Sequence, residues 1–159
     1  MNIQPSDASE TLVSAAENRD GATKSSIAPR SLGRGIGAVA AGFFTVVVLS
    51  LGTDQALHVL SVYPPWGQPM HEPGLNALAL SYRIVFTVLG GYVTARLSPD
   101  ASLRLVWILA GIGLFFGTLG AVSTIPMNLG PAWYPIALAL TAVPCTWLGG
   151  VLGRKRGWG

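Results

Sequence analysis

The chain has 159 residues, of which 50% are hydrophobic and only 11% are charged, with a formal net charge of +3. An ordinary soluble domain has roughly a quarter of its residues charged, so this composition is typical of a membrane protein, and the length allows at most one domain. The single cysteine, Cys145, excludes a disulfide framework, a Cys-x-x-Cys redox pair and a thiolate zinc site.

Residues 1–32 are expected to form a disordered cytoplasmic tail. They are rich in Ser, Ala, Asn, Asp and Glu and contain no apolar run long enough to bury a core. Their acidic and basic residues nearly balance, so the segment offers no polybasic patch for nucleic acid. A secretory signal is not expected either, because the first long apolar run begins only after Arg34.

Residues 33–156 are expected to form a domain of four transmembrane helices. The first uncharged run, 35–53, has 19 residues. At about 1.5 Å per residue it crosses a hydrocarbon core of about 30 Å. A helix that begins there is expected to continue to about residue 60, before the prolines of residues 61–73 form a loop.

The second predicted span contains one charge in its interior, Arg83, and is followed by a short hydrophilic turn. Residues 105–153 are 49 consecutive positions without Asp, Glu, Lys or Arg, which is enough for two further spans separated by breakers between Pro126 and Pro131. The fold class is therefore predicted to be all-α, an integral membrane four-helix bundle. Its spans are expected at about 35–60, 74–96, 104–125 and 132–153.

The basic residues predict the orientation of these spans. Nine of the ten Lys and Arg residues fall on the side of the two termini and of the turn between the second and third spans. Because basic residues near span ends are retained in the cytoplasm, both termini are expected to be cytoplasmic, in the inner membrane of a cell. The aromatic residues Tyr63, Trp66, Trp133 and Tyr134 are then expected at the outer membrane interface.

Arg83 is the most informative residue of the spans, because it is expected near the bilayer midplane. An arginine there costs about 2.5–3.5 kcal/mol on insertion scales and is rarely left without a partner. Asp54 is the natural partner, and His58 lies one helical turn further along the same face. Asp54, His58 and Arg83, with Tyr82 as a further candidate, form the predicted intramembrane polar cluster. The cluster either locks the first two helices together or forms a site for a ligand, an ion or a proton.

No catalytic, cofactor-binding or metal-binding residue is predicted. Asp54, His58, His71 and Glu72 would suit a divalent ion by type, but nothing in the sequence fixes their geometry, and adjacent residues such as His71 and Glu72 seldom ligate together. The pattern G-x-G-x-x-A at 35–40 matches part of a dinucleotide-binding motif, but a transmembrane segment follows it and no strand precedes it.

Glycines recur at the spacing of close helix packing. Gly33 and Gly37 form one GxxxG pair, Gly113 and Gly117 form a second, and Gly149 and Gly153 form a third. We expect them to pack helices within one bundle rather than to form a dedicated dimer surface. Residues 77–96 also align with residues 137–155 through shared ALAL and LGG strings at an offset of about 60 residues. Chance similarity between apolar spans is the favoured interpretation, and the alignment serves only as support for four spans.

Two strings carry a family resemblance, the loop YPPWGQPMHEPG and the span end LGGYVTARL. In these the sequence resembles a family of uncharacterised small four-span bacterial inner-membrane proteins of unknown function. The resemblance covers about residues 35–153. It implies a four-helix membrane bundle and brings no activity or catalytic residues with it.

The sequence thus predicts a non-enzymatic, multi-pass accessory or structural membrane protein. Its expected partners are the lipid bilayer and other membrane proteins or a second copy of the chain, with no nucleic acid. The alternative is a carrier for a small solute, an ion or a proton, which would act as a homo-oligomer because four helices are few to enclose a pathway. A membrane enzyme or quinone-binding redox subunit is disfavoured, since the spans lack paired histidines and clustered carboxylates.

Overall fold

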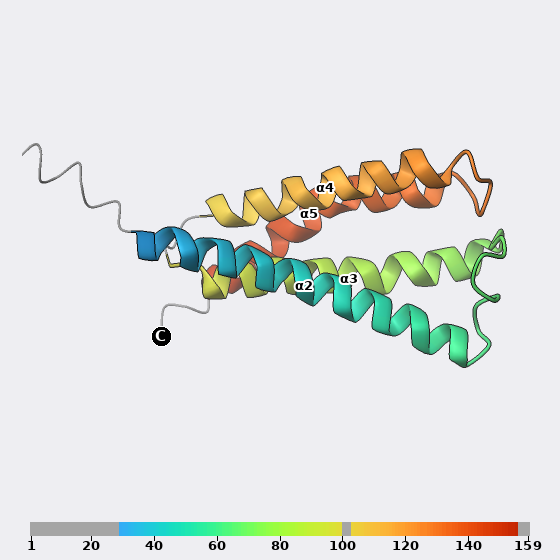
Figure 1. Cartoon of the computed structure of the whole chain (residues 1–159), viewed down its shortest axis with the longest axis horizontal. Coiled ribbons are helices and arrows are strands. Elements are labelled where there is room, and N and C mark those ends of the chain that lie inside the picture. Colours follow the sequence, from blue (N-terminus) through green and yellow to red (C-terminus); the bar gives the residue numbers. More distant parts are fainter. Residues whose placement is uncertain (1–28, 100–102, 156–159) are drawn as a thin grey trace, which may run out of the picture. The chain divides into compact units, whose positions relative to one another are not determined.

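The computed structural model describes residues 29–99 and 103–155, and this part of the chain contains four α-helices (Figure 1). Each helix includes a stretch that is long and apolar enough to cross a membrane. The prediction of an all-α, four-helix membrane fold is therefore confirmed, and the protein is a multi-pass membrane protein. The helices are α2 (Pro29–Val59), α3 (Pro73–Leu97), α4 (Arg104–Thr124) and α5 (Trp133–Lys155).

The candidate spans lie close to the predicted ones. They are Leu32–Val59, Pro73–Leu97, Arg104–Thr124 and Trp133–Arg154. Helix α2 begins at Pro29, inside the segment 1–32 that was expected to be a tail, and residues 1–28 of that segment lie outside the described residues. Pro73 occupies the first turn of α3, where its missing N–H costs no hydrogen bond.

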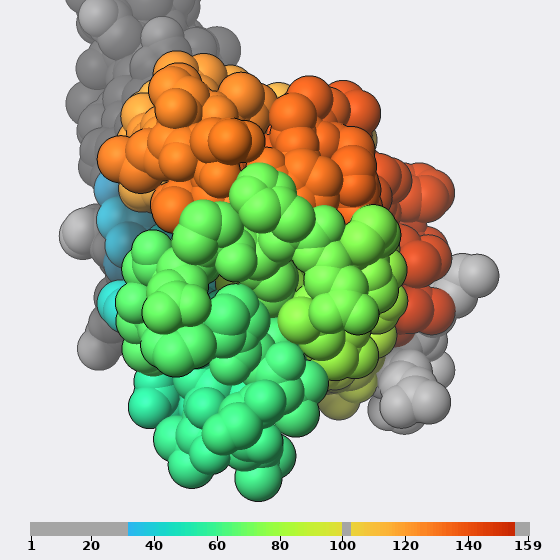
Figure 2. Space-filling view, turned by 90° about the vertical axis from the view of Figure 1, so that its right-hand side faces the viewer, coloured from blue at the N-terminus to red at the C-terminus, as the bar shows by residue number. Residues whose placement is uncertain are grey.

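The two loops, 60–72 and 125–132, lie side by side at one end of the bundle, which we call the loop end (Figures 1 and 2). The backbone N–H of Met70 donates to the carbonyl oxygen of Leu129 at 2.7 Å and joins the loops directly. The side-chain amide of Asn76 donates to the carbonyl oxygens of Met70 and Glu72, both at 2.9 Å. These bonds hold the first turn of α3 to the α4–α5 loop.

Small residues set the contacts between α2 and α3. A Cβ atom on Gly90 would lie only 2.9 Å from the carbonyl oxygen of Gly42, so the two backbones cross closely at this point. One turn away, the buried hydroxyl of Thr94 donates to the carbonyl oxygen of Ala38 at 3.2 Å. No pattern in the sequence predicted this contact between Gly42 and Gly90.

Two of the three predicted GxxxG pairs lie at contacts inside the bundle. The pair of Gly33 and Gly37 does not, because a Cβ atom on either residue would have no neighbouring heavy atom within 4 Å. A Cβ on Gly117 would lie 3.2 Å from Cα of Ala139, and Gly113 faces Ala142, so this pair lies between α4 and α5. Gly149 and Gly153 lie between α5 and α3, against the backbone of Val88 and Tyr92. These contacts are typical of small residues that let helices approach in lipid.

Helix α5 contacts both α3 and α4, and its packing shifts along its length, which includes Pro144. Before the proline, Ala139 and Ala142 pack on α4; after it, Thr146 and Gly149 pack on α3, while Gly150 still faces Val106 of α4. Figure 1 shows α5 passing from α4 to α3 along its length. A proline inside a helix removes a backbone hydrogen bond and kinks the helix, which accounts for this change of direction.

The aligned segments 77–96 and 137–155 do not have equivalent contacts. The alignment equates Gly91 with Gly150, but Gly91 faces Thr146 of the other hairpin, whereas Gly150 faces Val106 of its own hairpin. This difference agrees with chance similarity between two apolar spans.

Candidate intramembrane polar site

An ion pair connects α2 and α3. Nη2 of Arg83 lies 2.5 Å from Oδ2 of Asp54, and the two side chains are 25% and 9% exposed. The hydroxyl of Tyr82 donates to the other carboxylate oxygen of Asp54. The carboxylate therefore has a partner on each oxygen, as a buried charge requires. The predicted pairing of Asp54 with Arg83 is present, and so is the contact of Tyr82.

Arg83 also reaches the second hairpin. Its Nη1 donates to the hydroxyl of Tyr134 on α5 at 2.6 Å, and its Cζ lies 5.9 Å from the centre of the Tyr134 ring. One guanidinium thus joins α2, α3 and α5. The sequence predicted Tyr134 at the outer membrane interface and did not predict its bond to Arg83. The only indication of this bond in the sequence is that Tyr134 carries a hydroxyl group and lies near the start of the fourth predicted span.

Tyr63, in the α2–α3 loop, extends this set of side chains through its contact with Tyr82. Its hydroxyl lies 3.4 Å from the hydroxyl of Tyr82 and donates to the carbonyl oxygen of Leu75 at 3.4 Å. The side chain is buried, which raises the pKa of Tyr63 above the ordinary value for tyrosine. Tyr63 therefore remains a neutral hydrogen-bonding group at physiological pH. We call Asp54, Tyr63, Tyr82, Arg83 and Tyr134 the Arg83 cluster.

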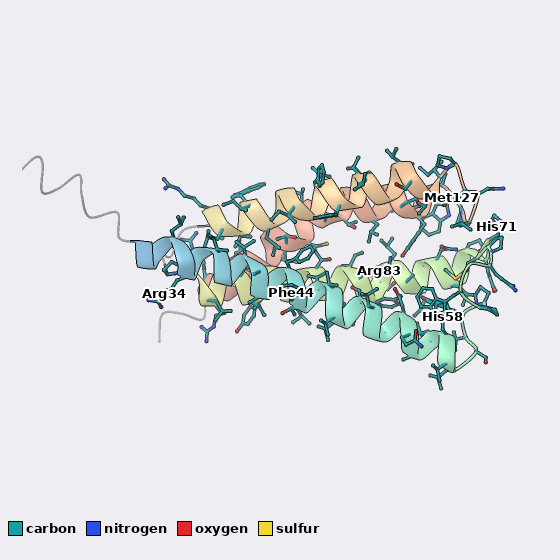
Figure 3. The ribbon with its side chains drawn as sticks, in the orientation of Figure 1. Arg34, Phe44, His58, His71, Arg83 and Met127 are labelled. Carbon is teal, nitrogen blue, oxygen red and sulfur yellow. The ribbon has the colours of Figure 1, made fainter. Side chains whose placement is uncertain are left out.

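The ring of His58 packs on two aromatic residues of the α2–α3 loop, Tyr63 and Trp66. Nδ1 of His58 lies 2.7 Å from the backbone oxygen of Asp54, and the ring stacks on Trp66 with centroids 4.0 Å apart and planes 3° apart. The ring also meets Tyr63 edge-on. In Figure 3, His58 lies nearer the loop end than Arg83 does. Of the three residues of the predicted cluster, Asp54 and Arg83 therefore come together, whereas the ring of His58 packs against loop aromatics.

The residues considered for a metal site do not meet. His71 and Glu72 are exposed in the α2–α3 loop. Within residues 29–99 and 103–155, no group of three or more His, Cys, Asp or Glu side chains could hold a metal ion.

Two cavities flank Arg83. The loop-side cavity, of about 300 Å³, is lined by Met70, Asn76, Arg83, Leu129, Tyr134 and Leu138, among others. The central cavity, of about 330 Å³, is lined by side chains of all four helices, including Phe43, Val47, Leu51, Arg83, Phe116 and Leu138. Each volume is at the lower end of the range for small-molecule sites. Arg83, Phe116, Gly117 and Leu138 line both cavities, which are therefore neighbours.

Comparisons with protein-family models, with curated proteins and with solved structures found no match for this chain. The four candidate membrane-spanning helices implied by the family resemblance are present, but the comparisons identify no family.

Proposed function

We propose that the protein is an accessory or structural membrane protein without enzymatic activity, which packs against other membrane proteins through its outer surface. The observation that carries this proposal is the internal use of the Arg83 cluster. The ion pair of Asp54 and Arg83 and the bond from Arg83 to Tyr134 connect helices of the same chain. An ion pair between helices of the same chain connects those helices within the bundle.

The proposal places the chain in the inner membrane with both termini in the cytoplasm. Its support is the distribution of basic residues. The two loops of the loop end contain no Lys or Arg, whereas Arg34, Arg96, Arg104 and Arg154 lie at the opposite ends of the four helices. Basic residues near span ends are retained on the cytoplasmic side, so the loop end faces outward.

A carrier for a small solute, an ion or a proton, acting as a homo-oligomer, is the second candidate. The observation that favours it is the position of Arg83, a charged side chain within the membrane-spanning region that lines two cavities. Charged groups inside a membrane often mark substrate or ion pathways.

Native mass spectrometry of the full chain, released from its own membrane in lipid particles, separates the two candidates. The accessory function predicts one copy held by a larger unrelated protein. The carrier function predicts a discrete homo-oligomer that retains a small molecule or ion. A homo-oligomer of this kind would overturn the accessory proposal.

A further inference from the structure

The two cavities beside Arg83 continue one another along the bundle. On α4, residues at intervals of three or four line first the loop-side cavity and then the central one: Thr124, Gly120, Gly117, Gly113 and Leu109. Residues at these intervals lie on one face of a helix. Gly117 lines both cavities, and so does Leu138 of α5. The two cavities therefore form one elongated space, which we call the slot, with a loop-side half and a central half.

The slot is long and narrow. Its lining on α4 extends from Ile125 to Leu109, a distance of about 24 Å at about 1.5 Å per residue. Its two halves have volumes of about 300 Å³ and 330 Å³. An α-helix with its side chains is about 10–12 Å wide, so a partner helix of this length would need several times the space of the slot. A single alkyl chain is much narrower, and the chains of one leaflet fill only half of a hydrocarbon core of about 30 Å. The slot is therefore long enough for a whole acyl chain.

The residues that line the slot are mainly apolar and offer no unpaired charge. Arg83, the one charged residue among the described residues that line it, has its two terminal nitrogens bonded to Asp54 and Tyr134. The hydroxyls of Thr87 and Thr146 in the central half donate to backbone oxygens of their own helices. A charged solute would lose its hydration here and find no unpaired opposite charge. The lining therefore favours an apolar occupant.

The slot reaches the surface of the bundle where lipid lies. Leu51 and Phe116 of the central half are 57% and 54% exposed, on a surface that lipid chains cover in a membrane. Ile125, at the end of the slot nearest the loops, is 40% exposed. We propose that the slot binds one acyl chain of a phospholipid from the leaflet at the loop end. The ester end of the chain lies beside Ile125 and its terminal methyl group lies in the central half. This site goes beyond the accessory function and does not depend on it.

Photochemical labelling of the full chain in nanodiscs tests the site. One phosphatidylcholine carries a diazirine at the end of its palmitoyl chain, and a second carries the diazirine next to the ester. Irradiation releases dinitrogen and leaves a carbene that inserts into neighbouring C–H bonds, and mass spectrometry of peptides locates the adducts. Leu109 and Ala142 of the central half are 4% and 9% exposed, and Ala121 of the loop-side half is 8% exposed, so lipid on the outer surface scarcely contacts them. We expect the terminal diazirine to label Leu109 and Ala142, and the diazirine next to the ester to label Ala121.

Two glycines of α4 provide a matched pair of variants. A Cβ on Gly120 or on Gly111 would meet no heavy atom of another helix within 4 Å, but only Gly120 lines the slot. Gly120→Leu fills the loop-side half and is expected to lower the labelling of the two central-half residues about tenfold. Gly111→Leu adds the same side chain outside the slot and is expected to leave that labelling unchanged. Val48 and Leu140, which are 63% and 69% exposed, report contact with lipid on the outer surface and should be labelled equally in all three proteins.

The unmodified chain alone can overturn the proposal, whatever the variants do. It is overturned when the terminal diazirine labels Val48 and Leu140 but neither Leu109 nor Ala142, or when the two diazirines label the halves of the slot in the reverse order. It is also overturned when Gly120→Leu folds and retains full labelling of the central half. A last arm uses palmitic acid with a terminal diazirine in place of the phospholipid. Central-half adducts with the free acid and none with the phospholipid would assign the slot to a separate amphiphile and overturn the proposed phospholipid chain.

Discussion

Arg83 of α3 and Tyr134 of α5 are joined by a hydrogen bond of 2.6 Å between Nη1 and the phenolic oxygen. The same guanidinium pairs with Asp54 of α2. The two helical hairpins are therefore connected at a charged group inside the membrane-spanning region. An isolated arginine would be costly there, because a buried charge without a partner has lost its hydration and gained nothing in return.

Breaking the ion pair from one side is expected to destabilise the protein more than removing it from both sides. Arg83→Leu leaves Asp54 buried without its cation and should lower the free energy of unfolding by about 3–5 kcal/mol. Adding Asp54→Leu should restore most of that loss, because two apolar side chains then replace a charge pair. Denaturation with dodecyl sulfate in mixed micelles measures both variants. Unchanged stability of Arg83→Leu would show that the pair does not hold the bundle.

Removing only the hydroxyl of Tyr134 should weaken the link between the hairpins. Tyr134→Phe retains the ring beside Arg83 and loses the hydrogen bond, for an expected cost of about 1 kcal/mol in the free energy of unfolding. Tyr92→Phe is the matched control, because its ring lies beside Arg96 and its hydroxyl has no hydrogen-bond partner among the described residues. Equal stability of the two variants in the same denaturation assay would contradict the prediction.

The close packing of α3 on α5 predicts a strong dependence on Gly149. A Cβ at this position would lie 2.8 Å from the backbone nitrogen of Tyr92 and closer still to the carbonyl oxygen of Val88, so Gly149→Ala should force the helices apart and cost about 2 kcal/mol. In α4, Gly111 has no heavy atom of another helix within 4 Å of such a Cβ. Gly111→Ala should therefore be neutral or stabilising by up to about 1 kcal/mol. Denaturant midpoints of the two variants check this, and a loss in Gly111→Ala equal to that in Gly149→Ala would argue against the packing.

Tyr63 predicts a loss of stability at high pH. Burial raises its pKa in the folded protein above the unfolded value of 10.0, so its contribution is complete below about pH 10 and is lost as the pH rises through the folded pKa. The unmodified chain should lose more of its free energy of unfolding above pH 10 than Tyr63→Phe does. Unfolding of both proteins between pH 8 and pH 11 measures this difference. Parallel pH profiles would refute it.

The proposed orientation predicts opposite labelling at the two ends of the bundle. A Cys145→Ala background removes the single cysteine. Gln68→Cys in the exposed α2–α3 loop should then react with a membrane-impermeant maleimide in intact cells. Leu97→Cys, at the opposite end of α3 and 51% exposed, should react only after the membrane is made permeable. The reverse pattern would place the termini outside the cytoplasm.

The pairing of Asp54 with Arg83 was predictable because these two residues are the only charged ones in the ranges 35–60 and 74–95, and each requires a partner. The orientation of the His58 ring was not predictable from the sequence. His58 lies four residues after Asp54 and therefore on the same face of α2. The α2–α3 loop brings Trp66 and Tyr63 against this face, and the His58 ring packs on them. The spacing of residues within one helix does not show which loop residues pack against that helix.

Within residues 29–99 and 103–155, the sequence by itself determined how many membrane-spanning helices there are and where they lie, since the length of an apolar run is a local property that decides whether a segment can cross a bilayer. Only the tertiary structure decided that Tyr134 reaches Arg83 across 51 positions and that Gly42 meets Gly90. Helices that face lipid are apolar on their outer as well as their inner sides, as exposed Phe115 and Val122 illustrate. Their sequences therefore give little indication of which face turns inward, and the rotation of each helix about its axis is settled only by packing against the others.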